Sequence, residues 1–225
     1  MAETTQHTPF LAHHFDDIEQ QRAAETLGMW TFLVTELLIF GVLLTSYAVY
    51  RYLYPHAFEA ASSHLNILIG GINTVVLLTS SLTMALSVHS ARTDRQRRLV
   101  VCLLLTAALG TLFMAFKAVE YYTDYKEDLV PGLAFNDAEW TEPQQVKLFL
   151  MFYYVMTGLH AVHLTIGIGL ILYLAHHAYR SRYSPEHYIP VDVSGLYWHF
   201  VDIIWIFLLP LLYLIGRHTS GDLHF

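Results

Sequence analysis

Pairs of polar side chains interrupt stretches of this sequence that are otherwise almost wholly apolar. The pairs, each separated by three residues, are His160 and His163, His199 and Asp202, and Lys117 and Glu120. Residues three apart project from the same face of a helix, so each pair forms a polar patch. Glu36 is a further, isolated position of this kind. Because ionisable groups are costly in apolar surroundings, each is a candidate for metal ligation, proton transfer or a structural bond.

The histidines could in principle hold a metal ion or a haem. Such a site needs several ligands that converge at one depth on facing helices. His160 and His163 fall near the middle of their apolar range, whereas His199 falls about 6 Å from the start of its range. The sequence has no ExxH, CxxCH or HExxH motif, and Cys102 is its single cysteine. We therefore predict no metal site and histidines that make structural or lipid contacts, with haem ligation by His160 and His163 as the alternative.

Four of these groups could also form a proton relay, because chains of Glu and His at membrane depth carry protons. They are Glu36, His163, His199 and Asp202. A relay needs acceptors from one membrane face to the other, and residues 39–44 and 206–212 are almost wholly apolar. We therefore expect static hydrogen bonds rather than a continuous path.

Lys117 and Glu120 fall near the outer end of their apolar range. We predict that they form an ion pair, or that their side chains snorkel toward water, at the interface on the outer side of the membrane. The aromatic residues of the last apolar range are predicted to act mainly as interfacial anchors and packing. They are Tyr197, Trp198, Trp205 and Tyr213.

Five apolar ranges must position these groups, namely residues 28–50, 66–88, 99–121, 148–175 and 195–216. Each is long enough, at about 1.5 Å per residue, to cross roughly 30 Å of hydrocarbon. Of the 12 basic and 19 acidic residues, four fall in these ranges, where an even spread would place about 16. Hydrophobic residues make up 55% of the 225-residue chain, and the mean hydropathy is +0.41. We predict an all-α, polytopic membrane protein with one bundle of five transmembrane helices over residues 27–217, because the ranges lack the alternation of a β-barrel.

The basic residues predict the orientation of this bundle. They gather after the second range, at Arg92, Arg95, Arg97 and Arg98, and after the fourth, at Arg180 and Arg182. Basic loops stay in the cytoplasm, so we predict that the tail of residues 1–26 is cytoplasmic and that residues 218–225 form a periplasmic tail. The first tail lacks the pattern of a signal peptide. The acidic loop of residues 123–146 is more typical of a solvated face than of a docking surface for a basic partner.

Four motifs resemble subunit III of the haem-copper oxidases, that is, the cytochrome c oxidase subunit III family. They are Leu27–Glu36, Asn73-Thr74 with Leu77–Ser81, the TGLHAVH run of Thr157–His163, and the YWHFVDIIW run of Tyr197–Trp205. The similarity covers about residues 20–216, and five helices are typical of the short bacterial form. Lys117 stands where the family usually has Gln, and Ala161 where it usually has Gly.

The resemblance implies a non-catalytic subunit of an aerobic terminal oxidase that reduces oxygen to water and translocates protons. Haem and copper are expected in partner subunits, with subunit I and subunit II as neighbours, bound phospholipid in this chain, and a location in the bacterial inner membrane. It further implies that a buried polar cluster and lipid contacts involve Glu36, His160, His163, His199, Asp202, Trp30 and Trp198. None of these residues is assigned a catalytic role.

Several alternatives remain open at the level of sequence. The third subunit of quinol oxidases is equally short, so the electron donor is either cytochrome c or quinol. Short five-helix relatives also suggest an accessory protein of nitric oxide reductase. A transporter is disfavoured because the chain has no internal inverted repeat. The net charge of −7 gives no electrostatic basis for binding nucleic acid, and association into a larger respiratory assembly is a further possibility.

Overall fold

The chain folds into a long bundle of helices, seen here in a computed structural model that describes residues 15, 17–132, 134–181, 183 and 188–215. The helices are α1 (Ile18–Leu53), α2 (Pro55–His64), α3 (Ile67–Arg92), α4 (Gln96–Lys126), α5 (Pro143–Tyr179) and α6 (Ile189–Tyr213). Within the described residues, all but α2 are long and apolar enough to cross a membrane. This confirms the prediction of an all-α polytopic membrane protein.

The helices extend beyond the apolar ranges of the sequence, because polar residues continue them outside the hydrocarbon. α1 begins within the predicted tail, where the Asp17 carboxylate accepts a hydrogen bond of 2.6 Å from the Gln20 backbone N–H and caps the first turn. The predicted tail segments before Phe15 and after Ile215 lie outside the described residues. We name the two ends of the bundle by their connections. The basic end holds the α3–α4 connection with Arg95, and the acidic end holds the α4–α5 connection with Asp137.

The acidic end carries structure that the apolar pattern did not predict. α2 starts at Pro55, a residue suited to the first helical position, and buries Phe58. Its Ser62 hydroxyl donates a 2.7 Å hydrogen bond to the Leu212 carbonyl at the end of α6. In the predicted loop, β1 (Leu129–Val130) and β2 (Ala134–Phe135) pair antiparallel, followed by the short helix η1 (Asp137–Glu139).

The buried positions of the helices recur at alternating steps of three and four residues. In α4 they include Leu99, Leu103, Thr106, Gly110, Phe113, Lys117, Glu120 and Asp124, and Ala107 is buried beside Thr106. In α6 they include Val191, Ser194, Trp198, Val201, Trp205, Leu208 and Leu212. An average step of 3.5 residues is typical of helices that pack with a left-handed supercoil. Because Lys117 and Glu120 occupy two of these steps, the packing pattern itself carries them into the core.

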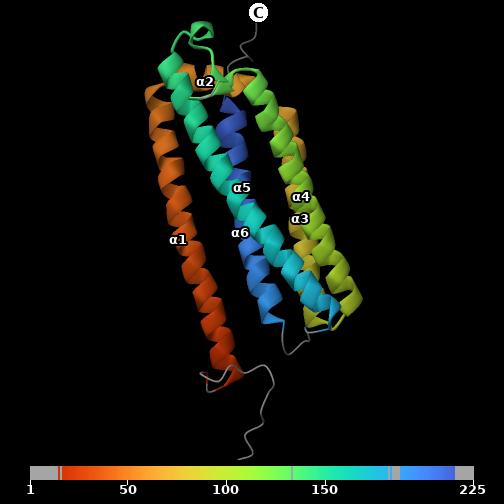
Figure 1. The fold of residues 1–225 in the computed structure, drawn as a ribbon. Coiled ribbons are helices and arrows are strands. Elements are labelled where there is room, and N and C mark those ends of the chain that lie inside the picture. Colours follow the sequence, from red (N-terminus) through yellow and green to blue (C-terminus); the bar gives the residue numbers. More distant parts are fainter. Residues whose placement is uncertain (1–14, 16, 133, 182, 184–187, 216–225) are drawn as a thin grey trace, which may run out of the picture.

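Four helices form the centre of the bundle, and α1 lies beside it. α3, α4, α5 and α6 pack in a ring, whereas α1 packs against the α5 and α6 side of it (Figure 1). In the most apolar part of α1, 11% of the residues are buried, against 50% in α6. Most of the α1 surface is therefore left for lipid or another protein.

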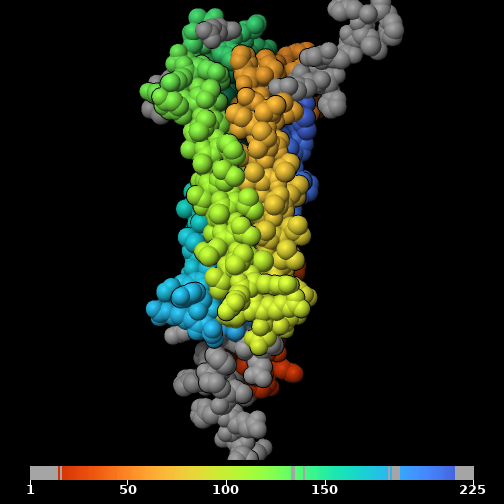
Figure 2. All heavy atoms as spheres, turned by 90° about the vertical axis from the view of Figure 1, so that its right-hand side faces the viewer, coloured from red at the N-terminus to blue at the C-terminus, as the bar shows by residue number. Residues whose placement is uncertain are grey.

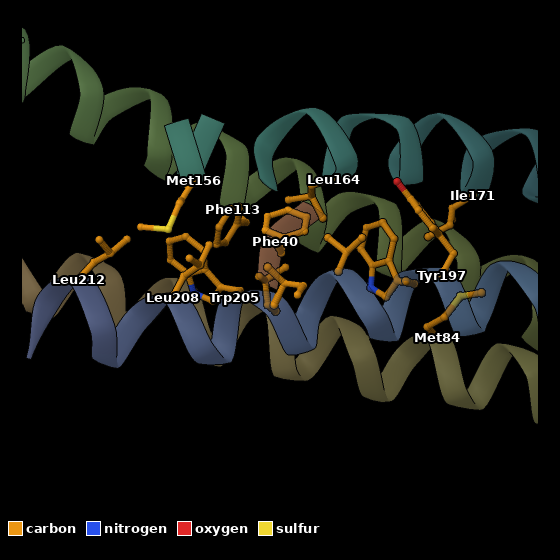
Figure 3. Packing of buried hydrophobic residues seen from close by; sticks show 14 of the residues in the cluster. Phe40, Met84, Phe113, Met156, Leu164, Ile171, Tyr197, Trp205, Leu208 and Leu212 are labelled. Atoms are coloured by element: carbon orange, nitrogen blue, oxygen red, sulfur yellow. The ribbon is translucent and has the colours of Figure 1, made fainter. Parts of the chain in front are cut away.

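Large aromatic side chains fill the core where glycines let the helices approach. Trp198 is fully buried, and a Cβ at Gly110 of α4 would lie only 2.7 Å from its ring. Further along α6, the rings of Trp205 and Phe113 meet edge to face with centroids 4.8 Å apart (Figure 3). Glycine at position 110 is needed because any larger residue would displace Trp198.

Candidate functional site

A lysine held by carboxylates and tyrosines lies inside the bundle near its acidic end. We define this lysine cluster as Lys117, Glu120, Asp124, Tyr153 and Tyr213. The Lys117 ammonium donates to Glu120 Oε2 at 3.1 Å, to the Tyr213 hydroxyl at 2.9 Å and to the Tyr153 hydroxyl at 3.2 Å. The cluster therefore joins α4, α5 and α6 through one cation.

The hydroxyl groups of the lysine cluster also lie within hydrogen-bonding distance of the carboxylates. Tyr213 donates to Glu120 Oε1 at 2.5 Å, and Tyr153 lies 3.0 Å from the same oxygen and 3.3 Å from Asp124 Oδ2. The Lys117 nitrogen also lies over four aromatic rings, at 4.9–5.6 Å from their centroids. Cation–π contacts of this kind stabilise a desolvated ammonium group. The three donor positions of Lys117 and both oxygens of Glu120 are thus occupied.

Lys117 and Glu120 form the predicted ion pair. Each side chain is only 3% exposed, so the pair is enclosed by the bundle and does not snorkel outward. Asp124 was predicted only as part of the acidic loop, and Tyr153 and Tyr213 were not predicted as hydroxyl partners. The signal for Asp124 was its place four residues after Glu120, in step with the buried positions of α4.

Glu36 and His163 form a second polar pair, between α1 and α5. His163 Nε2 lies 2.8 Å from Glu36 Oε2, and both side chains are 12% exposed. His163 Nδ1 lies 2.8 Å from the Leu159 carbonyl, which can only accept, so Nδ1 carries a proton. The pair is then either an imidazolium with a carboxylate or a neutral imidazole with a carboxylic acid, and it is neutral overall in both cases.

His199 and Asp202 lie where α6 packs against α3, with Ser81 opposite them. We call these three residues the α3–α6 seam. His199 Nδ1 lies 2.6 Å from the Ser81 hydroxyl and makes no bond to Asp202, although the two are three residues apart. Ser81 also lies close to the Asp202 carboxyl. Even so, neither carboxyl oxygen has a hydrogen-bond partner among the described residues, and Asp202 is 3% exposed.

The α3–α6 seam lies deeper than the sequence indicated. α6 begins at Ile189 rather than at residue 195, so His199 lies about 15 Å along it. The Tyr197 hydroxyl bonds the His163 carbonyl at 2.9 Å, which places His163 at a similar level. The predicted mismatch in histidine depth is therefore wrong, but the rings face different helices and do not converge.

The remaining predicted residues are mostly core residues. His160 packs between Phe113 and Trp205, and its Nε2 atom has no hydrogen-bond partner in the part of the chain that is described. The Trp198 indole donates to Ser80 at 2.8 Å, and the Trp205 indole donates to Thr74 at 3.1 Å.

The aromatic residues of α6 do not act as interfacial anchors. Tyr197, Trp198, Trp205 and Tyr213 are all buried, so that part of the prediction is wrong and the packing role holds. Trp30 differs from them: it is 54% exposed and lines a groove of about 340 Å³ between α1 and α6 with Phe200 and Phe207.

Several of the polar side chains bond one helix to another. Over the described ranges, no three His, Cys, Asp or Glu side chains come together as a metal site would require. The Glu36–His163 pair bonds α1 to α5, and the His199–Ser81 bond joins α6 to α3, as separate contacts. Each of them holds two helices together at membrane depth.

Comparison with known proteins agrees with this geometry. The family described as cytochrome c oxidase subunit III matches residues 5–217. Cytochrome c oxidase subunit 3 of Synechocystis sp. is 35% identical over 192 residues, which cover 84% of this chain and 74% of that protein. Cytochrome c oxidase subunit 3 of Thermostichus vulcanus is 32% identical, over 85% of this chain and 87% of that protein.

A relative that is named as a quinol oxidase subunit is also similar to this chain. The probable quinol oxidase subunit 3 of Staphylococcus haemolyticus is 27% identical over 87% of this chain and 90% of its own length. Both oxidase types therefore contain a subunit of this kind. The chain belongs to the cytochrome c oxidase subunit III family, as a membrane-spanning subunit of a haem-copper oxidase.

Proposed function

We propose that this chain is a non-catalytic subunit that stabilises the haem-bearing subunit of an aerobic terminal oxidase. Subunits I and II are its expected partners, and oxygen reduction and proton translocation take place on those partners. Cytochrome c is the proposed donor because two relatives at 35% and 32% identity are cytochrome c oxidase subunits. Quinol is the alternative, on the basis of the relative from Staphylococcus haemolyticus.

The observation that carries this proposal is the use of polar side chains as bonds between helices. Lys117 joins three helices, Glu36 bonds His163 across α1 and α5, and Trp198 and Trp205 bond hydroxyl groups of α3. A catalytic group must be free to contact a substrate or a cofactor. These groups are instead engaged within the chain, which favours a structural role.

The α3–α6 seam is the proposed contact with the haem-bearing subunit. His199 is half-buried and has one ring nitrogen without a hydrogen-bond partner among the described residues, whereas both oxygens of Asp202 are enclosed by the chain. Large apolar side chains beside the seam are exposed, including Leu78 and Ile203, each at 49%. Polar groups at membrane depth favour a hydrogen-bonding partner over lipid. A transmembrane helix that offers a hydroxyl, amide or cationic group fits this surface.

The location and lipid content of the chain are part of the same proposal. We place it in the bacterial inner membrane with the basic end in the cytoplasm, because basic connections are retained there. Bound phospholipid is expected along the exposed apolar surface of α1, where Leu38 and Val42 are 65% and 66% exposed. The Trp30 groove offers one such apolar surface.

Gentle detergent purification through a tag on this chain tests the proposal. We expect co-purification of haem absorbance, with oxygen uptake driven by reduced cytochrome c. Oxygen uptake with quinol alone would assign the chain to a quinol oxidase. Absence of both haem and oxygen uptake would overturn the oxidase role and favour the accessory role with nitric oxide reductase.

The proposed partner contact has its own test. His199→Leu removes from the α3–α6 seam the ring nitrogen that has no partner, together with the Nδ1 bond to Ser81, and Thr165→Val removes an exposed hydroxyl from α5 as a control. We expect the first variant to recover less haem per tagged chain than wild type after purification, and the control to recover the same amount. Equal recovery from both variants would contradict the placement of the partner at this seam.

A further inference from the structure

We propose that a cationic pocket between α3 and α4 at the basic end binds the headgroup of an anionic phospholipid. The proposal deepens the lipid binding expected for an oxidase subunit, and it concerns residues that neither the family motifs nor the polar clusters include. The pocket has a volume of about 320 Å³. Its lining includes His89, Arg95, Arg97 and Arg98, with Leu86 and Val101 below them.

The charge of this pocket is uncompensated within the described chain. Arg95, Arg97 and Arg98 are exposed, and none of them forms an ion pair with another described residue. The neighbouring Arg92 is different, because it bonds Asp192 at 2.8 Å and lies 5.0 Å from the Tyr188 ring centroid. None of the residues that line the pocket is acidic. An anion is therefore the ligand that the pocket favours.

Exposed apolar side chains follow the pocket toward the membrane centre. On α3, His89 is followed toward the membrane centre by Leu86 and Leu82, which are 47% and 61% exposed. On α4, Arg98 is followed in the same direction by Val101 and Leu105, at 55% and 48%. Figure 2 shows this face, on which α3 and α4 lie side by side and their connection projects at the lower end. At the end of the bundle α4 thus presents Arg98 and α3 presents His89, each with an apolar stripe beneath it.

This combination matches the two parts of an anionic phospholipid. Guanidinium groups bond phosphate oxygens through paired N–H groups, and basic pockets on the cytoplasmic side of membrane proteins hold acidic lipid headgroups. The exposed leucines and Val101 provide a surface for acyl chains, which a free phosphate ion would not use. A zwitterionic headgroup also carries an ammonium group, and the pocket lining offers no carboxylate to receive it.

Lipid titration of the tagged, detergent-purified complex, followed by native mass spectrometry, tests this site. The probes are phosphatidylglycerol, phosphatidylcholine and inorganic phosphate. Arg97→Gln/Arg98→Gln neutralises two guanidiniums of the pocket, and Arg180→Gln/Arg182→Gln removes the same charge from the other basic connection, of which Arg182 lies outside the described residues. We expect phosphatidylglycerol to bind roughly tenfold or more weakly to the first double variant and with unchanged affinity to the control.

Three outcomes would overturn the proposal. They are an equal loss of phosphatidylglycerol binding in both double variants, tight binding of phosphatidylcholine at the same site, and displacement of the lipid by inorganic phosphate alone. Arg97→Lys/Arg98→Lys keeps the charge that orients the membrane helices, so it remains informative if the neutral variant fails to insert. We expect it to bind phosphatidylglycerol with intermediate affinity, because lysine lacks the guanidinium fork. Wild-type affinity in this variant would contradict recognition through that fork.

Cys102 offers a second readout because its side chain also lines the pocket. We expect phosphatidylglycerol, but not phosphatidylcholine, to slow the modification of Cys102 by a maleimide, as followed by peptide mass spectrometry. Equal rates with the two lipids would contradict binding at this position. The haem absorbance of the same sample reports separately on the oxidase role, so failure of one proposal is distinguishable from failure of the other.

Discussion

The lysine cluster and the α3–α6 seam place carboxyl groups in similar apolar surroundings with opposite results. In the lysine cluster, Glu120 accepts hydrogen bonds from a lysine and from tyrosine hydroxyls on two neighbouring helices. In the seam, Asp202 is equally buried and has no partner for either oxygen among the described residues. A carboxyl group is therefore hydrogen-bonded within the chain in one region and has no hydrogen-bond partner among the described residues in the other.

This difference separates a carboxyl group that bonds neighbouring helices from one that makes no hydrogen bond among the described residues. A buried ion pair that is fully hydrogen-bonded can be kept at membrane depth, whereas an isolated carboxylate is costly there. The lysine cluster ties α4, α5 and α6 together near the acidic end. The seam gains nothing comparable from its own chain, and it lies beside exposed apolar side chains on α3 and α6.

Removal of the cation should break the lysine cluster most severely. Lys117→Leu leaves Glu120 and Asp124 buried without a positive charge, and we expect the free energy of unfolding to fall by about 3–5 kcal/mol. Thermal unfolding of the purified chain in detergent measures this loss. Lys117→Leu/Glu120→Gln removes both charges of the ion pair and should recover part of the stability. A double variant less stable than Lys117→Leu would contradict an ion pair as the source of the effect.

Loss of one hydroxyl group should weaken the same cluster less. Tyr213→Phe removes a hydrogen bond to Glu120 and an acceptor for Lys117, and we expect a loss of about 1.5–3 kcal/mol, as for bonds to charged groups. Tyr173→Phe, at an exposed position of α5, is the control. Equal unfolding temperatures for both variants would show that the Tyr213 hydroxyl contributes nothing to the cluster.

The stability contributed by the Glu36–His163 pair should lie between the contributions of the lysine cluster and of the α3–α6 seam. A double-mutant cycle with Glu36→Gln and His163→Gln should give a coupling free energy near about 0.6 kcal/mol and no larger than about 1.7 kcal/mol, the range for hydrogen bonds between membrane helices. Chemical unfolding in mixed micelles yields the four stabilities required. A coupling free energy as large as the loss expected for Lys117→Leu would be the contradicting result. One hydrogen bond between two helices would then stabilise the chain as much as the lysine cluster, which joins three helices.

A substitution in the seam should change the isolated chain least. Asp202→Asn keeps the shape of the side chain and breaks no hydrogen bond among the described residues. The free energy of unfolding in detergent should change by less than about 1 kcal/mol, which is the contribution of one hydrogen bond. A loss as large as that of Tyr213→Phe would show that Asp202 has a strong partner within the chain, and would contradict the comparison between the two regions.

Much of the fold could be predicted because membrane insertion depends on local composition. Apolar ranges of sufficient length identified the five spanning helices, and the spacing of His160, His163 and Glu36 identified polar positions within them. The TGLHAVH and YWHFVDIIW motifs identified the family that the comparisons show. These signals depend on residues close together in the chain, so the sequence alone carries them. The short helix α2 gave no such signal, because it is too short and polar to resemble a span.

The partners of each polar side chain were decided only by the tertiary structure. Lys117 meets Tyr153 and Tyr213, which are 36 and 96 residues away, because α4, α5 and α6 pack in one register. His199 bonds Ser81 rather than Asp202, since α6 faces α3 at that level. The sequence determined which residues enter the membrane, through the cost of transferring charge into hydrocarbon. The packing of distant helices determined which of those residues meet, because hydrogen bonds form only between groups that the backbone brings within about 3 Å.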